Sequence, residues 1–265
     1  MRPSRLLLAL GAVVALALPS AVLSQGEDGY LTTPFGIISV LPPAPVKGDA
    51  RYAADRAIFR KTRALVGSPR WILATADVKT APADMLHDFS CAVGIELTPD
   101  NAPRLVALVG RAGRDTSGQT NIAKNLYKRA RPFRIDKVPA AKICQPVKEL
   151  AGSYDYPSGH TTLGWTWATI LAELAPDHAG AILARGRAYG ESRIVCGAHN
   201  ASAVEAGRLS ASATLTAVRA TRAYQDDFAA ARAELDALRR TAAVPDPKLC
   251  RAETELVGKN ILAAP

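Results

Sequence analysis

The chain has 265 residues, 48% of them hydrophobic, and it carries a formal net charge of +9. This length is enough for one large domain or two small ones. The positive charges are scattered, without a long Lys/Arg run or interleaved aromatic residues. The sequence therefore argues against a nucleic-acid-binding protein and fits a basic surface or a small anionic partner.

Residues 1–24 predict a secretory signal peptide. Arg2 and Arg5 precede an apolar run over residues 6–18, and small residues suited to cleavage follow up to Ser24. This run is shorter than the roughly 18 residues that a membrane-spanning helix needs, and no later stretch reaches that length. We therefore expect export to the periplasm and no stable membrane insertion of the mature chain. An uncleaved N-terminal anchor is the alternative.

Residues 25–48 are rich in proline and glycine and predict an irregular N-terminal arm. Helical patterns dominate residues 49–265, as in the apolar face formed by Leu163, Trp167, Ile170, Leu171 and Leu174. Alternating strand patterns are nearly absent. The sequence therefore predicts a single all-α domain, a packed helical bundle. Helices are expected at residues 50–66, 85–97, 102–116, 161–175, 178–193 and 203–240.

The four cysteines are Cys91, Cys144, Cys196 and Cys250, and no pair has the CxxC spacing of a zinc or redox motif. Export to an oxidising compartment favours disulfides. Four cysteines allow three pairings, which the sequence alone does not settle. Of these we favour Cys91 with Cys144 and Cys196 with Cys250.

The first of three polar motifs is KNLYKRARP, residues 124–132. Lys124 and Arg131 are seven positions apart, about two helical turns, so on one helix they share a face. Pro132 is expected to end that helix. Two cations near a helix end could hold an anion, although most such pairs are only solvated.

The second motif is YPSGHTTLGW, residues 156–165, a turn followed at once by a helical pattern. The N–H groups and the dipole at a helix N-terminus form a ready anion site. Ser158 adds a hydroxyl, Gly159 lets a ligand approach the backbone, and His160 is placed to give or take a proton. The alternative is an ordinary capped turn with a structural histidine.

The third motif is SRIVCGAHNASA, residues 192–203. Arg193 has the planar, forked geometry that binds anions through two hydrogen bonds. His199 follows six residues later, in a short loop before the next helix. This spacing makes both residues candidates for an anion site.

Together the motifs read K-x6-RP, PSGH and SR-x5-H. This set resembles the bacterial class A non-specific acid phosphatases, within the superfamily of type 2 phosphatidic-acid phosphatases and vanadium haloperoxidases. The resemblance extends over the mature chain and includes PRW at residues 69–71 and FSCAVG at residues 89–94. It implies an all-α fold, small phosphorylated substrates, an acid pH optimum, a homo-oligomer, and no metal or other cofactor.

The resemblance also implies a role for each motif. His199 would be the nucleophile that forms a phosphohistidine, and His160 the general acid that protonates the leaving alcohol and then the base that activates water. The phosphoryl oxygens would be held by Lys124, Arg131, Ser158, Gly159 and Arg193. These residue types suit phosphoryl transfer, which asks the protein for positioning and charge stabilisation. Two histidines in different environments can divide the nucleophile and acid roles.

The chain departs from the family pattern at one catalytic position. In the family the third motif continues H-x3-D, and that Asp orients the nucleophilic histidine, but here the position is Ala203. The nearest downstream carboxylate is Glu205, which with Ser202 fits a capping box at a helix start. We therefore expect Glu205 to be used by the helix and to point away from His199.

Other groups could orient His199 in part: Asn200, Ser202, a backbone carbonyl or a water. Asp155, directly before the second motif, could also face the pocket, but nothing in the sequence requires it. We expect a periplasmic acid phosphatase that hydrolyses phosphomonoesters, with activity weakened at Ala203. The alternative is a catalytically silent protein that binds phosphoesters. A haloperoxidase and a phosphatase of lipid-like esters are two further alternatives, although the former are usually longer and relatives acting on membrane lipids commonly span the bilayer.

Overall fold

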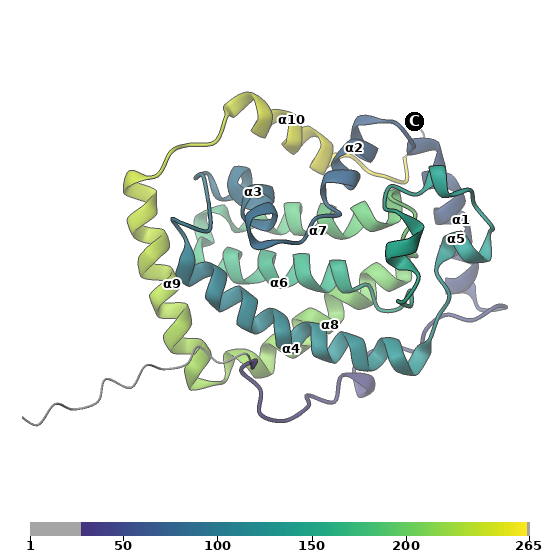
Figure 1. Cartoon of the computed structure of the whole chain (residues 1–265), viewed down its shortest axis with the longest axis horizontal. Helices are drawn as coiled ribbons and strands as arrows, with labels where there is room; N and C mark the ends of the chain where they lie inside the picture. The colour runs from purple at the N-terminus through teal and green to yellow at the C-terminus, as the bar shows by residue number, and fades with distance from the viewer. Residues whose placement is uncertain (1–27, 264–265) are drawn as a thin grey trace, which may run out of the picture.

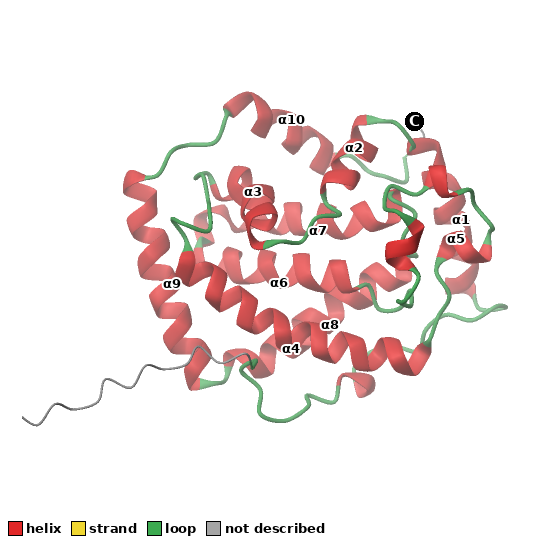
Figure 2. Ribbon diagram, in the orientation of Figure 1, coloured by secondary structure: helices red, strands yellow, loops and turns green. Residues whose placement is uncertain are grey.

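The computed structural model describes residues 28–263 of the chain. Within this range the regular secondary structure is entirely helical, which confirms the predicted all-α fold (Figure 2). The predicted signal peptide, residues 1–24, and the first residues of the predicted arm lie outside the described residues. None of the described helices is long and apolar enough to cross a membrane.

Four long helices form the centre of the molecule. They are α4 (Pro103–Tyr127), α6 (Gly159–Leu174), α7 (Ala179–Val195) and α8 (Ala201–Arg219). α6 packs against the other three, and Figure 1 shows it in the middle with α7 on one side and α4 and α8 on the other. Around them lie α1 (Ala50–Thr62), α2 (Pro69–Ala76), α3 (Pro82–Val93), α5 (Pro132–Ile135), α9 (Arg222–Thr241) and α10 (Pro247–Gly258).

Glycines let α6 and α7 lie close together. A Cβ added at Gly164 of α6 would come within 2.3 Å of the Tyr189 ring on α7. A Cβ added at Gly190 of α7 would lie 2.9 Å from the side chain of Thr161. Both distances are too short for a real side chain, so glycine is required at these contacts. The start of α6 therefore lies against the last turns of α7, which brings the second and third motifs together.

The predicted helices differ from the structure in several respects. The helix expected over residues 102–116 is longer, since α4 continues to Tyr127. The helix predicted over residues 203–240 is two helices, α8 and α9, because Thr221 interrupts it and N-caps α9 with its side chain. The short helix α5 was not predicted, and neither were the longer helices α2 and α10. α2 and α10 each begin with a polar N-cap, Ser68 or Asp246, followed by a proline at the first helical position, which is a common helix start.

The described part of the N-terminal arm is packed on the bundle. The short 3-10 turn η1 (Ile37–Ser39) contacts α4 and α8, and Ile37 and Leu41 are buried. Earlier in the arm, the Tyr30 hydroxyl donates a hydrogen bond to Asp227 of α9 at 2.7 Å. The arm therefore lies against α4, α8 and α9.

The disulfides are Cys91–Cys250 and Cys144–Cys196, so the favoured pairing was wrong. The first bond joins α3 to α10. α10 has contacts with α2 and α7 and lies on the same side of the bundle as α3 (Figure 1). The second joins the loop after the 3-10 turn η3 (Ala140–Lys142) to the C-terminal end of α7. Cys250 lies on α10, a helix that was not predicted from the sequence, and this helix places it beside Cys91.

Candidate active site

His199 lies in the tight loop between α7 and α8 and is only 2% exposed. Gly197 takes the left-handed conformation (φ 78°) that turns the chain at this point. The N–H groups of Ala198 and His199 then both donate to the carbonyl oxygen of Arg193, each at 3.1 Å. These bonds fix the backbone that carries the histidine.

The two ring nitrogens of His199 have different partners. Nδ1 lies 2.7 Å from the carbonyl oxygen of Asp155 and 3.2 Å from its Oδ1, whereas Nε2 lies 2.9 Å from Nη1 of Arg131. A carbonyl oxygen only accepts hydrogen bonds, so Nδ1 carries the proton and Nε2 presents its lone pair. Burial, together with the positive charges of Arg131, Lys124 and Arg193, holds the pKa of His199 well below its usual range. The ring is therefore neutral and able to act as a nucleophile through Nε2.

Lys124 and Arg131 converge on the site from different segments. α4 ends at Tyr127, because Lys128 takes the left-handed C-cap conformation (φ 45°). The prediction that Lys124 and Arg131 share a helical face ended by Pro132 was therefore wrong, and Pro132 instead begins α5. Both side chains are nevertheless buried, and the charge of each acts on His199.

Backbone carbonyls hold two of the cations in place. The Lys124 Nζ donates to the carbonyl of Tyr154 at 2.8 Å. Arg131 donates from Nε to the carbonyl of Ser153 at 2.9 Å and from Nη1 to that of Ala198, also at 2.9 Å. These acceptors orient the side chains without neutralising their charge.

Arg193, in the last turn of α7, is fully buried and donates from Nη2 to Oε1 of Gln145 at 2.5 Å. Burial lowers the pKa values of Arg131 and Arg193 to about 10. Burial and then the charge of Arg131 lower the pKa of Lys124 to about 7. A buried cluster of cations is costly unless a counter-charge is present, so the arrangement favours an anion.

The start of α6 lies beside these cations. Ser158 is the N-cap, and its Oγ accepts hydrogen bonds from the Thr161 N–H at 3.3 Å and the Thr161 hydroxyl at 2.9 Å. Gly159 is the first helical residue, and a Cβ added to it would lie 3.7 Å from Cε of Lys124. The backbone at this helix start is therefore next to the lysine, as an anion held by both would need.

His160 is the second histidine of the site. Its Nε2 lies 3.0 Å from the carbonyl oxygen of Val78, so Nε2 carries a proton. No hydrogen bond to Nδ1 occurs among the described residues. Burial, and then the charge of Arg193, lowers the pKa of His160 to about 3. His160 is therefore neutral in the ligand-free site, with the Nδ1 lone pair available.

Asp155 is the site residue to which the sequence assigned no role, and it is 0% exposed. Its Oδ1 accepts from the backbone N–H of Asn200 at 3.0 Å, and its Oδ2 accepts from the Asn200 side chain at 2.7 Å. Nη1 of Arg129 lies 3.4 Å from Oδ2. Burial holds the pKa of Asp155 above its usual value, although Arg129 and the Asn200 hydrogen bonds oppose part of this rise. The sequence signal was a charged residue directly before a tight turn, whose burial requires partners.

The predicted capping box at the start of α8 was wrong. Asn200 is the N-cap, and α8 begins at Ala201. Ser202 instead donates from its hydroxyl and its N–H to the Asp55 carboxylate, at 2.6 and 2.9 Å. Glu205 is exposed, whereas His199 is buried. The carboxylate beside His199 therefore comes from the loop before α6 and not from α8.

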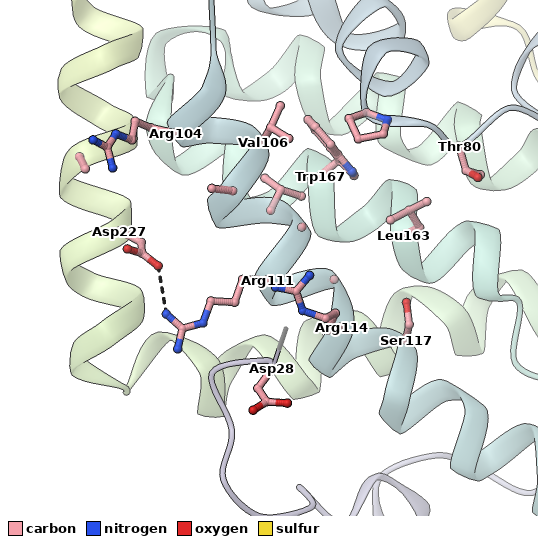
Figure 3. Close-up of a pocket in the computed structure, with 16 residues that line it drawn as sticks. Asp28, Thr80, Arg104, Val106, Arg111, Arg114, Ser117, Leu163, Trp167 and Asp227 are labelled. Carbon is pink, nitrogen blue, oxygen red and sulfur yellow. Dashed lines mark hydrogen bonds and ion pairs between the residues drawn. The ribbon is translucent and has the colours of Figure 1, made fainter. Parts of the chain in front are cut away.

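Other parts of the described chain lack comparable chemistry. No group of three His, Cys, Asp or Glu side chains among residues 28–263 could hold a metal ion. A cavity of about 1190 Å³ lies between α4, α6 and α9, and its lining includes Arg111, Leu163 and Trp167 but no histidine (Figure 3). The cluster around His199 is the better candidate, because it combines a nucleophile, an acid–base group and buried cations.

Known proteins are similar in sequence to this chain. A model of the PAP2 superfamily matches residues 105–227. An acid phosphatase of Zymomonas mobilis is 43% identical over 215 residues, which cover 80% of each chain. A non-specific acid phosphatase of Providencia stuartii is 32% identical over 77% of this chain and 82% of its own, and one of Salmonella typhimurium is 34% identical over 74% and 78%.

Proposed function

The chain belongs to the bacterial class A acid phosphatases of the PAP2 superfamily, and from this we propose that it hydrolyses phosphomonoesters through a phosphohistidine formed on His199. One observation carries the proposal. The Nε2 lone pair of His199 faces the Arg131 guanidinium at 2.9 Å, while Nδ1 is held by Asp155 on the other side of the ring. A phosphoryl group bound by the cations would meet this lone pair.

In the first step, Nε2 of His199 attacks phosphorus and the bond from phosphorus to the leaving oxygen breaks. Lys124, Arg131 and Arg193 hold the phosphoryl oxygens together with the Ser158 hydroxyl and the Gly159 N–H. They stabilise the charge of the transition state without having to reorganise. His160 gives a proton from Nδ1 to the leaving oxygen, so that an alcohol departs.

In the second step, a water molecule loses a proton to Nδ1 of His160 and attacks phosphorus. The phosphorus–nitrogen bond breaks and phosphate leaves. His199 returns to the neutral ring that keeps its proton on Nδ1, and His160 is again protonated, ready to pass that proton to the departing phosphate or to solvent. Each residue therefore ends in its starting form.

The proton for the leaving group comes with the substrate. His160 is neutral in the empty site, since its pKa is lowered to about 3. A phosphomonoester has a second pKa near 6, so below this pH it arrives carrying one proton. Transfer of that proton to His160, followed by transfer to the leaving oxygen, gives activity at acid pH.

The alternative is a phosphoester-binding protein without turnover, and its basis was the missing carboxylate at Ala203. The contact between Asp155 and Nδ1 supports the active enzyme instead. We also propose that residues 1–24 direct the chain to the periplasm, where the two disulfides fit the oxidising conditions. A homo-oligomer remains a prediction.

Hydrolysis of p-nitrophenyl phosphate by the mature chain, from about pH 4 to 8, tests the proposal. We expect turnover that His199→Ala abolishes and that His87→Ala, on the exposed face of α3, leaves intact. Rapid quenching into alkali should trap an acid-labile phosphorus–nitrogen bond at residue 199. Turnover equal in wild type and His199→Ala would overturn the assignment.

A further inference from the structure

Asp155 approaches the His199 ring with both its backbone and its side chain. The carbonyl oxygen lies 2.7 Å from Nδ1 and the carboxylate Oδ1 lies 3.2 Å from the same atom. The backbone is itself anchored, because the Asp155 N–H donates to the carbonyl of Arg129 at 2.9 Å. One residue therefore offers Nδ1 a neutral acceptor and a charged one.

We infer that Asp155 is the positioning residue of His199 and supplies, from the loop before α6, the carboxylate that the family carries at the position of Ala203. The inference rests on the proposed function and adds a residue to it. The carbonyl fixes which nitrogen carries the proton. The carboxylate supplies negative charge beside the ring when Nε2 bonds to phosphorus and the imidazole becomes cationic.

The charge balance of the site supports this role. His199 is surrounded by the buried cations Lys124, Arg131 and Arg193, which all oppose a positive charge on the ring. The Asp155 carboxylate is in contact with the ring on the side away from Arg131. It therefore stabilises the cationic phosphohistidine at the point where the cations destabilise it.

The carboxylate is also held as a functional group must be. Asn200 donates to it twice, at 3.0 and 2.7 Å, and Arg129 lies 3.4 Å away. These donors offset part of the cost of burying the charge. They also leave Oδ1 directed at both the Asn200 N–H and Nδ1 of His199. A purely structural carboxylate would need only the first three contacts.

Ala203 itself cannot serve in its place, because a methyl group neither accepts a hydrogen bond nor carries a charge. Ala203 is fully buried in an apolar cluster with Tyr156, Ile37 and Ala206. A carboxylate here would lie against apolar side chains. Alanine at position 203 is therefore consistent with a carboxylate supplied by Asp155 instead.

The test compares two isosteric substitutions, Asp155→Asn and Asp55→Asn. Asp55 is a matched control, because it is also buried and paired with Arg129, at 2.7 Å, but binds Ser202 and not His199. We expect both variants to lose thermal stability. Only Asp155→Asn should lose kcat, by roughly 10- to 100-fold, with the inhibition constant of inorganic phosphate nearly unchanged.

The His199 ring provides a second readout. In the wild type, nitrogen NMR should show a protonated Nδ1 with a strongly deshielded proton, and that proton should shift in Asp155→Asn but not in Asp55→Asn. The wild-type spectrum keeps the test valid if Asp155→Asn does not fold. Equal kcat in the two variants would overturn the inference. So would an Nδ1 proton whose chemical shift is the same in the wild type and in Asp155→Asn. If the wild type showed no turnover that depends on His199, the proposed function would be overturned. The NMR spectrum would still test the contact between Asp155 and His199.

Discussion

His199 and Arg131 are in direct contact, with Nε2 of the ring 2.9 Å from Nη1 of the guanidinium. The group proposed to hold a phosphoryl oxygen is thus already beside the nitrogen proposed to attack phosphorus. Its charge also contributes to the low pKa of His199. Binding of the substrate and activation of the nucleophile therefore depend on the same arginine.

Arg131→Gln should lower kcat/KM by about 10²- to 10³-fold, as expected for loss of one oxyanion donor. The pKa of His199 should rise, because a positive charge next to the ring is removed. The measurements are steady-state kinetics and an NMR titration of His199. Arg134→Gln is the control, since Arg134 lies on the same segment but is exposed. An unchanged His199 titration in Arg131→Gln would contradict the electrostatic role.

Affinity for anions should fall as the pH rises through 7. The pKa of Lys124 is lowered to about 7, so the cation is present below this pH and is lost above it. Tungstate, which remains a dianion here, should inhibit about tenfold more weakly per pH unit above 7, until its binding no longer depends on Lys124. In Lys124→Met the inhibition should be weak and independent of pH over this range. A parallel pH dependence in the variant would show that another group titrates.

The pH at which kcat/KM falls on the alkaline side should depend on the second pKa of the substrate. If the leaving-group proton arrives with the phosphomonoester, substrates with a higher second pKa should remain active to a correspondingly higher pH. The measurement compares p-nitrophenyl phosphate with an alkyl phosphate under identical conditions. A fall at the same pH for both substrates would instead assign it to a group of the enzyme, and His160 would then have to be protonated before binding.

Restoring the family residue by Ala203→Asp should not increase kcat. The side chain would enter the apolar cluster with Tyr156 and Ala206, and a buried unpaired charge costs about 3–5 kcal/mol. Urea unfolding should therefore show a loss of stability, and Ala203→Asn should lose less. A rise in kcat in Ala203→Asp would mean that Asp155 does not serve His199.

The two disulfides should affect activity differently. Cys144–Cys196 lies beside Gln145, which binds Arg193, and the Cys144 N–H donates to the Cys196 carbonyl at 3.1 Å. Replacing this pair by alanine should lower kcat/KM by roughly tenfold, in line with loss of an outer-shell support. Replacing Cys91 and Cys250 should cost about 2–5 kcal/mol of stability without changing kcat/KM. Equal kinetic effects of the two replacements would contradict this division.

The helical periodicity predicted the fold class and the main helices, because helices such as α3 and α6 bury many apolar side chains. It missed α2 and α10, each of which begins with a polar N-cap and a proline. The motifs and the family resemblance led to the candidate site residues, and the second and third motifs meet because α6 and α7 pack closely at Gly164 and Gly190. The conformation of the chain between the motifs was less predictable. The end of α4 depended on the left-handed conformation of Lys128, which has no strong sequence signal.

The role of Asp155 could not be predicted from spacing. Asp155 and His199 are 44 residues apart in the chain, and their contact depends on how the loop before α6 folds over the start of α8. The Ser158 N–H donates to the Ala203 carbonyl at 2.9 Å, which joins these two segments. Only three-dimensional information identifies such a pair.

The location of Asp155 changes how related sequences should be classified. A search that requires aspartate four residues after the histidine would count this chain among the inactive members of its family. The chemical requirement is a carboxylate next to Nδ1, and a fold of this kind can supply it from either of two segments. A chain that has alanine at the later position and an acid before PSGH should therefore be assayed before it is set aside as a pseudoenzyme.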